Sequence, residues 1–285
     1  MLRHLKIFRL AGWSLIPAAL ILLNGCATPS LDLQEPTTKQ YTAAKNVLNY
    51  SPIDPSRNVP RAKMLSTVNR VLYRVRTSAY KVCKNLYPQD ERCTLMHTAD
   101  VNVDLENDDI NAYADQNNDI GIHGGLVTNM GSDDEIAAVL AHEYAHVMHG
   151  HVRKRTTNTA IGMLIGATLG IALGSRTDDG NPGQTIADLT NYGGAIGSTV
   201  YSPLMEIEAD RTAIYILKDA GFNISGMRNA IVRLSRLQAK QKSGVFSGKV
   251  GFLETHPSDN RRVAHIISAS EDADSDVPLA DLKRQ

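Results

Sequence analysis

Apolar residues recur at intervals of three and four positions across residues 64–82, which is the pattern of an amphipathic helix. In residues 101–105 apolar and polar side chains alternate instead, and residues 120–122 place a glycine between two isoleucines, so both segments are predicted to be short strands. An apolar face at helical spacing returns over residues 133–152. The pattern therefore predicts a helix, a small sheet and a second long helix, in that order.

The second of these helices begins at a clear signal and carries the first candidate chemistry. Ser132 and Glu135 match a capping box, which satisfies backbone amides at a helix start. Within the helix, His142, Glu143 and His146 form an H-E-x-x-H motif. Two histidines four residues apart lie on one helical face and can bind one metal ion, with the glutamate beside them. Two unrelated surface histidines are the alternative, but a chance match is improbable in a chain with 9 histidines.

A catalytic zinc ion also needs a third protein ligand and one open position. The metzincin spacing would place a histidine at position 152, where this chain has Val152, so the sequence excludes that class. His149 and His151 are interpreted as solvated residues or as residues that support a metal ligand. The third ligand is then expected to be an acid on a separate helix.

The segment Glu206-Ile207-Glu208-Ala209-Asp210 offers such an acid at the start of another apolar helix. Glu206 and Asp210 are four residues apart and share a face, so Glu206 can bind the metal while Asp210 holds a ligand histidine. Glu208 lies about 200° around the helix from Glu206, so both cannot face the metal. Spacing alone does not choose between the two glutamates, and a solvated acidic helix start is the third possibility.

The combination of His142-Glu143-x-x-His146 with Glu206-x-x-Ala209-Asp210 resembles the gluzincin peptidases of family M48, which include the CAAX prenyl protease and HtpX-like membrane proteases. Within that family the pattern is most similar to the periplasmic metallopeptidases of the BepA and LoiP kind. Further similarities lie in Asn111-Ala112, in Gly124-Gly125-Leu126, and in Thr255-His256-Pro257 with Arg262. The resemblance extends over residues 61–267.

This resemblance implies an α+β, zincin-like (minigluzincin) metallopeptidase domain over residues 61–268, mostly helical, with a small sheet at the edge of the active-site cleft. It implies one zinc ion per subunit, bound by His142, His146 and Glu206. The strand around residues 120–123 is expected at the rim of the cleft, where an extended substrate could pair with it.

The implied reaction is the hydrolysis of peptide bonds by a metalloendopeptidase. Glu143 would take a proton from the zinc-activated water and return it to the leaving amine. Asp210 would hold a ligand histidine, with Arg262 beside the site. His256 would lie near the zinc, where it either steadies the reaction intermediate or occupies the open position and keeps the enzyme latent. The alternative is that Thr255-His256-Pro257 is a simple turn and Arg262 a surface charge.

The N-terminal residues predict export. Residues 1–25 combine basic residues with a short apolar run, which is typical of a signal peptide. Leu23-Asn24-Gly25-Cys26 resembles a bacterial lipobox, so Cys26 is expected to carry a lipid that anchors the chain in a membrane. An uncleaved signal anchor or ordinary secretion are the alternatives. The expected location is the bacterial cell envelope, facing the periplasm, with the outer membrane favoured over the inner.

Two further segments are predicted to lie outside the folded domain. Residues 26–60 are polar and rich in proline and are expected to form a flexible tether, and residues 269–285 are expected to form a disordered acidic tail. Between them, Cys83 and Cys93 could form a disulfide bond in an oxidising compartment, with two free thiols as the alternative.

The middle of the chain is rich in glycine. Residues 160–174 are apolar with glycines spaced by four, and at 15 residues they are short of the roughly 20 needed to span a bilayer. They are interpreted as a buried hairpin helix, or as an element that dips towards the membrane. Residues 175–197 are expected to be mobile and to act as a lid over the cleft.

Composition limits the classes of function. The chain is 42% apolar and carries 30 basic and 30 acidic residues, so it is globular, and its neutral balance argues against nucleic acid as a partner. The leading hypothesis is a lipid-anchored zinc peptidase that acts on misfolded or regulated envelope proteins in protein quality control. The alternative is a periplasmic chaperone or assembly factor for outer-membrane proteins that uses the zinc cleft mainly for binding. A hydrolase of cell-wall crosslinks fits the motifs poorly.

Overall fold

The computed structural model describes residues 29–50, 55–174, 182–198 and 201–284. They fall into two units, which are described separately. The larger unit comprises residues 29–153 and 200–285, and the smaller comprises residues 1–28 and 154–199. The expected signal peptide and Cys26 lie outside the described residues.

The larger unit is mostly helical with one small sheet, so the predicted α+β class is confirmed. Its elements, in chain order, are α2 (Thr38–Tyr50), α3 (Arg61–Leu86), α4 (Arg92–Thr98), β1 (Val101–Asp104), β2 (Ala112–Ala114), β3 (Ile120–His123), α5 (Gly124–Asn129), α6 (Asp133–Met148), α9 (Pro203–Asp219), α10 (Ser225–Lys242), α11 (Phe252–Thr255), α12 (Asn260–Asp274) and the 3₁₀ helix η1 (Leu279–Leu282).

Helix α6 lies at the centre of the larger unit, where it packs against α3, α9 and α10. Its start follows the predicted cap, because the Ser132 hydroxyl accepts a hydrogen bond from the backbone N–H of Glu135. The helix ends four residues earlier than the sequence pattern predicts. Gly150 has φ +65°, a left-handed conformation that suits glycine and stops the helix just after His149.

Helix α9 packs against α6 on one side and α12 on another. Ser202 caps it by accepting a hydrogen bond from the backbone N–H of Met205, and Pro203 occupies its first turn. Gly221, with φ +69°, follows its C-terminal end. These two caps place Glu206 in the first turn of α9, where it faces α6.

The sheet has the strand order β1-β3-β2. The central strand β3 runs parallel to β1, with Val101 opposite Ile120, and antiparallel to β2, with Ala112 opposite Ile122. The expectation that an extended substrate could pair with residues 120–123 is therefore wrong, because both edges of β3 are already paired. The strand at the edge that packs against α6 is β2.

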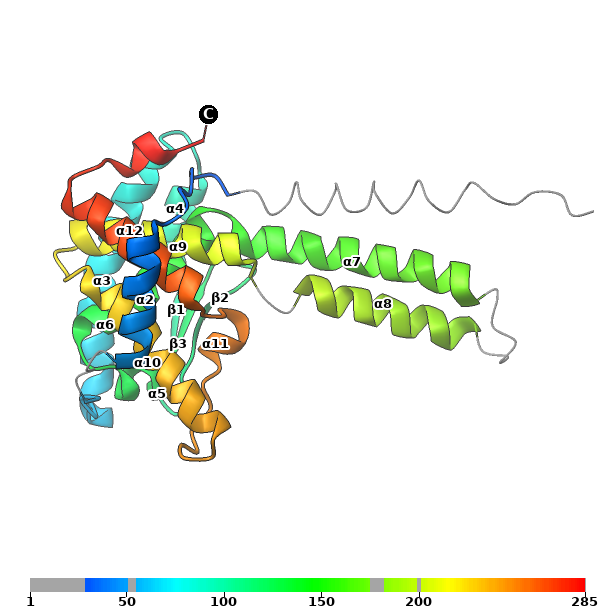
Figure 1. The fold of residues 1–285 in the computed structure, drawn as a ribbon, viewed down its shortest axis with the longest axis horizontal. Helices are drawn as coiled ribbons and strands as arrows, with labels where there is room; N and C mark the ends of the chain where they lie inside the picture. Colours follow the sequence, from blue (N-terminus) through cyan, green and yellow to red (C-terminus); the bar gives the residue numbers. More distant parts are fainter. Residues whose placement is uncertain (1–28, 51–54, 175–181, 199–200, 285) are drawn as a thin grey trace, which may run out of the picture. The chain divides into compact units, whose positions relative to one another are not determined.

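The structure differs from the predicted tether in residues 26–60. Residues 38–50 form helix α2, which packs along α12; Figure 1 shows these segments from opposite ends of the chain side by side. Leu31 is fully buried and forms a β-bridge with Lys283. The polar composition hid this arrangement, because a few apolar side chains such as Ala44 and Leu31 are enough to dock the segment on a preformed surface.

The predicted disordered tail is also ordered over most of its length. Helix α12 continues to Asp274, with Ala269 and Ala273 buried, and Leu279 anchors η1. The acidic side chains that suggested disorder lie on the outer side of these elements or form ion pairs with basic side chains, as Asp272 does with Arg211 (Oδ2–NH1 2.6 Å).

The described residues of the smaller unit form most of α7 (His151–Gly174), from residue 154 onward, and all of α8 (Pro182–Ser198). A methyl group built on Gly166 would lie 2.0 Å from the carbonyl oxygen of Leu189, and one on Gly170 would lie 2.6 Å from Cα of Ile186. The spaced glycines therefore let α7 and α8 pack closely as a helical hairpin.

Two expectations for this region need correction. The hairpin is not buried throughout, because large apolar side chains are exposed on α7: Met163, Leu164, Leu169 and Ile171. The segment expected to be a mobile lid is helical over 182–198, while residues 175–181 lie outside the described part of the chain. Among the described residues, no helix combines the length and apolarity that a membrane span requires.

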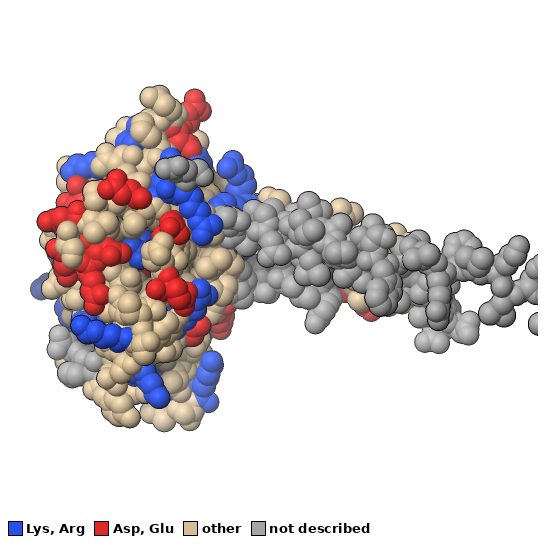
Figure 2. Space-filling model, turned by 45° about the horizontal axis from the view of Figure 1, so that its top comes forward, with Lys and Arg blue, Asp and Glu red and all other residues tan. Residues whose placement is uncertain are grey.

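The charged side chains of the larger unit intermix on its surface. Figure 2 shows lysine and arginine side chains lying among aspartate and glutamate side chains on one face. Many of them form exposed ion pairs, such as Arg70 with Asp133 and Lys81 with Asp219. Exposed pairs of this kind contribute little to stability, so the fold depends mainly on its apolar core.

Candidate metal centre

Four potential metal ligands from three parts of the chain converge inside the larger unit. His142 and His146 come from α6, Glu206 comes from α9, and His256 follows α11; one ligand atom of each lies within 4.8 Å of all the others. We call these four residues the metal cluster. All four side chains are buried.

The two helix motifs account for three of these positions. His142 Nε2 and His146 Nε2 lie 2.9 Å apart, because residues four apart stand one above the other on α6. Glu206 brings Oε2 to within 3.4 Å of His142 Nε2 and Oε1 to within 3.3 Å of His146 Nε2. The packing of α9 on α6 therefore chooses Glu206, not Glu208, to face the two histidines.

Glu143 lies beside the cluster, with His256 Nε2 3.6 Å from its Oε1. Its side chain is fully buried, and neither carboxylate oxygen has a hydrogen-bond partner among the described residues. Burial raises the pKa of Glu143 above its ordinary value, although the nearby His256 opposes this shift. A buried carboxylate without a hydrogen bond is costly in a folded protein, so its placement beside the cluster indicates a functional role.

Asp210 and Arg262 support the cluster from behind. Asp210 Oδ1 lies 2.8 Å from His142 Nδ1, and Arg262 donates two hydrogen bonds to the same carboxylate, from Nε (2.7 Å) and NH2 (2.8 Å). Arg262 NH1 also lies 2.7 Å from Glu206 Oε2. Arg262 is buried, so its interpretation as a surface charge is wrong.

The charges in this region shift the titration of the ligands. Burial alone would lower the pKa of His142, but its contacts with Asp210 and Glu206 outweigh burial and raise the pKa to about 9. Burial would raise the pKa of Glu206, but the Arg262 guanidinium and the neighbouring histidines hold it well below its usual range. Glu206 is thus kept as an anion, the form that binds a cation.

His256 is held inside the cluster from several sides. Its Nδ1 lies 3.1 Å from Glu206 Oε1 and 3.3 Å from His142 Nε2, and its Nε2 lies 3.6 Å from Glu143 Oε1. The Phe252 ring stacks on its imidazole, with centroids 4.4 Å apart. His256 is therefore part of the cluster, and the alternative that it belongs only to a simple turn is wrong.

Tyr201 is a neighbour of the cluster that the sequence analysis missed. Its ring stacks on His146, with centroids 3.9 Å apart, and on His256, with centroids 5.0 Å apart. Its side chain is buried. An aromatic residue just before the capped start of α9 is the only sequence signal for this contact, and it is too common to be diagnostic.

His149, His151 and Glu208 are also buried, so the interpretation of the two histidines as solvated residues is wrong. His151 Nδ1 lies 2.9 Å from His146 Nδ1, and His151 Nε2 lies 3.0 Å from Glu208 Oε2. The remaining possibility, that these histidines support a metal ligand, matches the contacts of His151. His149, His151 and Glu208 thus form a second buried polar group beside the cluster, on the face of α9 opposite to Glu206.

The donor set suits a divalent transition metal ion. Imidazole nitrogens with one carboxylate form typical ligand sets for such ions, and each ligand here has a second partner that fixes its orientation. A cavity of about 210 Å³ opens beside Glu206 and is lined by Pro203, Glu206, Ile207, Pro257, Ser258, Asp259, Arg261 and Arg262. The site therefore combines a metal-binding cluster, a buried carboxylate without a hydrogen bond among the described residues, and an adjoining cavity.

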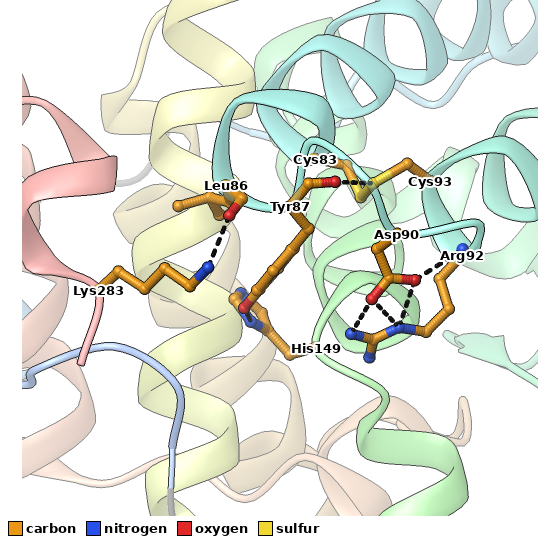
Figure 3. The surroundings of a disulfide bond; sticks show 8 residues. All are labelled: Cys83, Leu86, Tyr87, Asp90, Arg92, Cys93, His149 and Lys283. Atoms are coloured by element: carbon orange, nitrogen blue, oxygen red, sulfur yellow. Dashed lines mark hydrogen bonds and ion pairs between the residues drawn. A yellow bond between two sulfur atoms is a disulfide. The ribbon is translucent and has the colours of Figure 1, made fainter. Parts of the chain in front are cut away.

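A disulfide bond joins α3 and α4, two helices that pack against α6. Cys83 at the end of α3 and Cys93 in α4 are joined, with their Cα atoms 5.6 Å apart. Figure 3 shows that Tyr87, between the two cysteines, points towards His149, to which it lies within hydrogen-bond distance (Oη–Nδ1 3.1 Å). The disulfide therefore holds a loop that contacts the polar group behind the metal cluster.

Comparisons with known proteins agree with this geometry. Residues 88–270 match the family model described as peptidase family M48. The metalloprotease LoiP of Escherichia coli is 29% identical over 162 residues (55% of this chain, 58% of LoiP), and the metalloprotease YcaL of the same organism is 31% identical over 163 residues (55% and 57%). The beta-barrel assembly-enhancing protease of Yersinia pestis is 29% identical over 169 residues (56% and 32%).

The alignments therefore span less than two thirds of each of these relatives. The matched region contains α6, α9 and all four members of the metal cluster. This confirms the resemblance that the two motifs indicate and assigns the zincin-like fold. The chain belongs to peptidase family M48.

Proposed function

We propose that this chain is a zinc-dependent metalloendopeptidase. The observation that carries the proposal is Glu143, a fully buried carboxylate without a hydrogen-bond partner among the described residues, set beside a cluster of metal ligands. A protein that only bound clients would not need this costly arrangement. In a peptidase the same group has a function, because a base must stand beside the metal.

His142, His146 and Glu206 would hold the zinc ion. When bound, zinc polarises the scissile carbonyl and lowers the pKa of the attacking water to about 7. Glu143 would take a proton from the attacking water and return it to the leaving amine. Asp210 and Arg262 keep His142 and Glu206 in place during the reaction.

His256 would keep the resting enzyme latent. A catalytic zinc site has three protein ligands and an open position, whereas four ligands of this kind close the site. The contacts of His256 Nδ1 with His142 and Glu206 put it in a position to be that fourth ligand. This position favours the latent role over the supporting role, so we infer that His256 moves away when substrate binds.

Strand β2 would bind the substrate backbone. It is an edge strand of the sheet and packs against α6, the helix that carries both histidines. An extended peptide that pairs with a strand edge is held through its backbone, so its sequence matters little. The cavity beside Glu206 would take one substrate side chain.

The cell envelope is the proposed site of action. A lipid on Cys26 would anchor the chain, in the outer membrane rather than the inner, and the disulfide bond between Cys83 and Cys93 is of a kind that persists in oxidising compartments. Misfolded or regulated envelope proteins would be the substrates. Since one relative is named a beta-barrel assembly-enhancing protease, a role in assembling outer-membrane proteins is the second candidate function.

The test compares the wild type with Glu143→Gln, each with and without His256→Ala to remove the proposed latency. All four proteins are expected to hold one zinc ion, measured by elemental analysis. Cleavage of casein should fall by at least about 100-fold in the two Glu143→Gln proteins, because the base is lost while the ligands remain. Absence of zinc from the wild type, or equal cleavage with and without Glu143, would refute the proposal.

A further inference from the structure

The ligand His146 has a second contact that is not part of the metal cluster. Its Nε2 faces His142 and Glu206, so its Nδ1 is directed away from them. That nitrogen lies 2.9 Å from Nδ1 of His151, which is fully buried at the start of α7. A metal-binding imidazole carries its proton on the nitrogen that does not bind the metal, so His146 would donate this hydrogen bond and His151 would accept it.

This direction fixes the next contact. If His151 accepts at Nδ1, its proton is on Nε2, and Nε2 lies 3.0 Å from Glu208 Oε2. An ionised carboxylate is an acceptor, so this hydrogen bond is also complete. Every group from His146 to Glu208 then has the proton arrangement that its neighbour requires.

The other carboxylate oxygen of Glu208 binds the N-terminal segment. Glu208 Oε1 accepts hydrogen bonds from the backbone N–H of Ser30 (2.6 Å), the backbone N–H of Leu31 (2.8 Å) and the Ser30 hydroxyl (2.7 Å). These donors come from a segment 178 positions away in the chain.

We propose that His151 and Glu208 are positioning residues for the metal ligand His146, and that Ser30 and Leu31 complete this support. The inference rests on the proposed function, in which His146 binds zinc. It assigns a role to the glutamate of the E-x-E-A-D segment that does not face the metal. The metal site is then fully supported only when the N-terminal segment lies on Glu208.

The arrangement matches that of the other ligand histidine. His142 is held directly by a carboxylate of α9, Asp210, which is itself held by Arg262. His146 is held by a second carboxylate of α9, Glu208, through His151. Such contacts to the second ring nitrogen orient a ligand and raise its basicity, and their loss typically weakens metal binding by about 10- to 100-fold.

The substitution Glu208→Gln tests this chain of hydrogen bonds while keeping the size of the side chain. If the amide NH₂ faces His151, the His151 proton must move to Nδ1, and two donors then face each other between His151 and His146. If the amide is turned around, its NH₂ faces the backbone N–H groups of Ser30 and Leu31. One link is lost in either orientation.

The experiment measures the zinc dissociation constant of the full-length protein, purified in detergent, by competition with a chromophoric chelator. Glu135→Gln is the matched control, because Glu135 is also a buried carboxylate that accepts hydrogen bonds, and its partners among the described residues are Gly131 and Arg233 rather than members of the metal cluster. Circular dichroism checks the fold of each variant. Casein cleavage at saturating zinc, in the His256→Ala background, separates kcat from KM.

Glu208→Gln is expected to weaken zinc binding by about 10- to 100-fold, whereas Glu135→Gln should leave zinc affinity unchanged. In Glu208→Gln, the fold decrease in kcat should be larger than the fold change in KM. Ser30→Ala, which removes one of the three donors to Glu208 Oε1, should weaken zinc binding by about fivefold without loss of fold. Ser30→Ala is the variant that tests the inference if Glu208→Gln does not fold.

Wild-type zinc affinity in a folded Glu208→Gln protein, or in Ser30→Ala if Glu208→Gln is unfolded, would overturn the inference while leaving the peptidase proposal intact. Absence of zinc binding by the wild type would instead remove the proposed function on which the inference rests. The two failures are thus distinguishable.

Discussion

Three acids spaced by two residues along α9 contact buried histidines in three different ways. Glu206 faces the two α6 histidines, Asp210 contacts His142 from behind, and Glu208 points to the other side of the helix, towards His151. The rotation of about 100° per residue along a helix explains this division. Glu206 and Asp210 are four apart and share a face, whereas Glu208 lies roughly opposite Glu206.

The residue with the largest expected effect on regulation is His256. Replacing it with alanine would open the fourth position of the metal site, since its Nδ1 lies 3.1 Å from Glu206 Oε1. If the closed state dominates at rest, kcat/KM for casein should rise by about tenfold or more in His256→Ala, because the competent state no longer has to be selected from a small population.

The control for this prediction is the double variant His256→Ala/Glu143→Gln, which should show no gain, since any new cleavage must use the same base. A loss of activity in His256→Ala at saturating zinc would show the opposite role, in which the imidazole supports the reaction intermediate.

At the scale of elements, the position of α6 depends on helices that lie around it. It packs against α3, α4, α9 and α10, so a shift of any of them would move His142 and His146 relative to Glu206. Helix α9 is placed by its caps and by α12, which carries Arg262 to the site. The smaller unit contributes a hairpin of α7 and α8 whose close approach needs Gly166 and Gly170.

The disulfide bond gives an element-scale prediction. It closes a loop with a sequence separation of 10 between α3 and α4. Restricting the unfolded chain over a loop of this size is worth about 2–3 kcal/mol, so Cys83→Ala/Cys93→Ala should lower the free energy of unfolding by that amount. Urea unfolding, followed by circular dichroism, measures the loss.

Adding a reductant provides a second test of the stabilising effect of the disulfide bond. It should destabilise the wild type by a similar amount and leave the double variant unchanged. An unfolding midpoint of the wild type that does not respond to reductant would show that the bond contributes nothing.

At the scale of the larger unit, its first and last described segments pair with each other, and the first also binds Glu208 of α9. Residues 30–32 pair with 282–284, including a hydrogen bond from the backbone N–H of Asp32 to the carbonyl oxygen of Leu282 (2.6 Å), and α2 packs on α12. Under the proposed lipidation, only the residues between Cys26 and the buried contact at Ser30 connect lipid to protein, a reach of at most about 14 Å. The larger unit would then be held close to the bilayer.

Helix α12, under α2, also gives the larger unit a dependence on pH. His265 is buried, and neither of its ring nitrogens has a hydrogen-bond partner among the described residues. Burial lowers its pKa to about 4, although the Glu35 carboxylate 3.8 Å away opposes the shift. In the unfolded chain His265 has its ordinary pKa of 6.5 and is protonated below that pH. In the folded protein it stays neutral until the pH approaches about 4.

The sign follows from this difference. The contribution of neutral His265 to the free energy of unfolding is fully present above pH 6.5 and is lost as the pH falls towards about 4. We expect the loss to be roughly 1–2 kcal/mol once solvent screening near the exposed Glu35 is allowed for. His265→Leu should remove it, so the difference in unfolding free energy between wild type and variant, measured in urea between pH 7 and 4.5, should change with pH. A constant difference would contradict the assignment.

Much of the site was predictable from the sequence because it depends on local geometry. His142 and His146 share a face of a capped helix wherever that helix lies, and the same rule pairs Glu206 with Asp210. The caps at Ser132 and Ser202 act within one turn. Family resemblance, not spacing, was needed to choose Glu206 over Glu208 as the group that faces the metal.

The tertiary structure decided what depends on segments far apart in the chain. The entry of His256 into the metal cluster, 114 positions from His142, follows from how α11 and α12 pack. The contact of Glu208 with Ser30 depends on the docking of a polar segment that hydrophobic periodicity does not reveal. The sequence by itself therefore determined which side chains can bind a metal, whereas packing decided which groups hold those side chains in place, because such contacts join surfaces rather than neighbours in the chain.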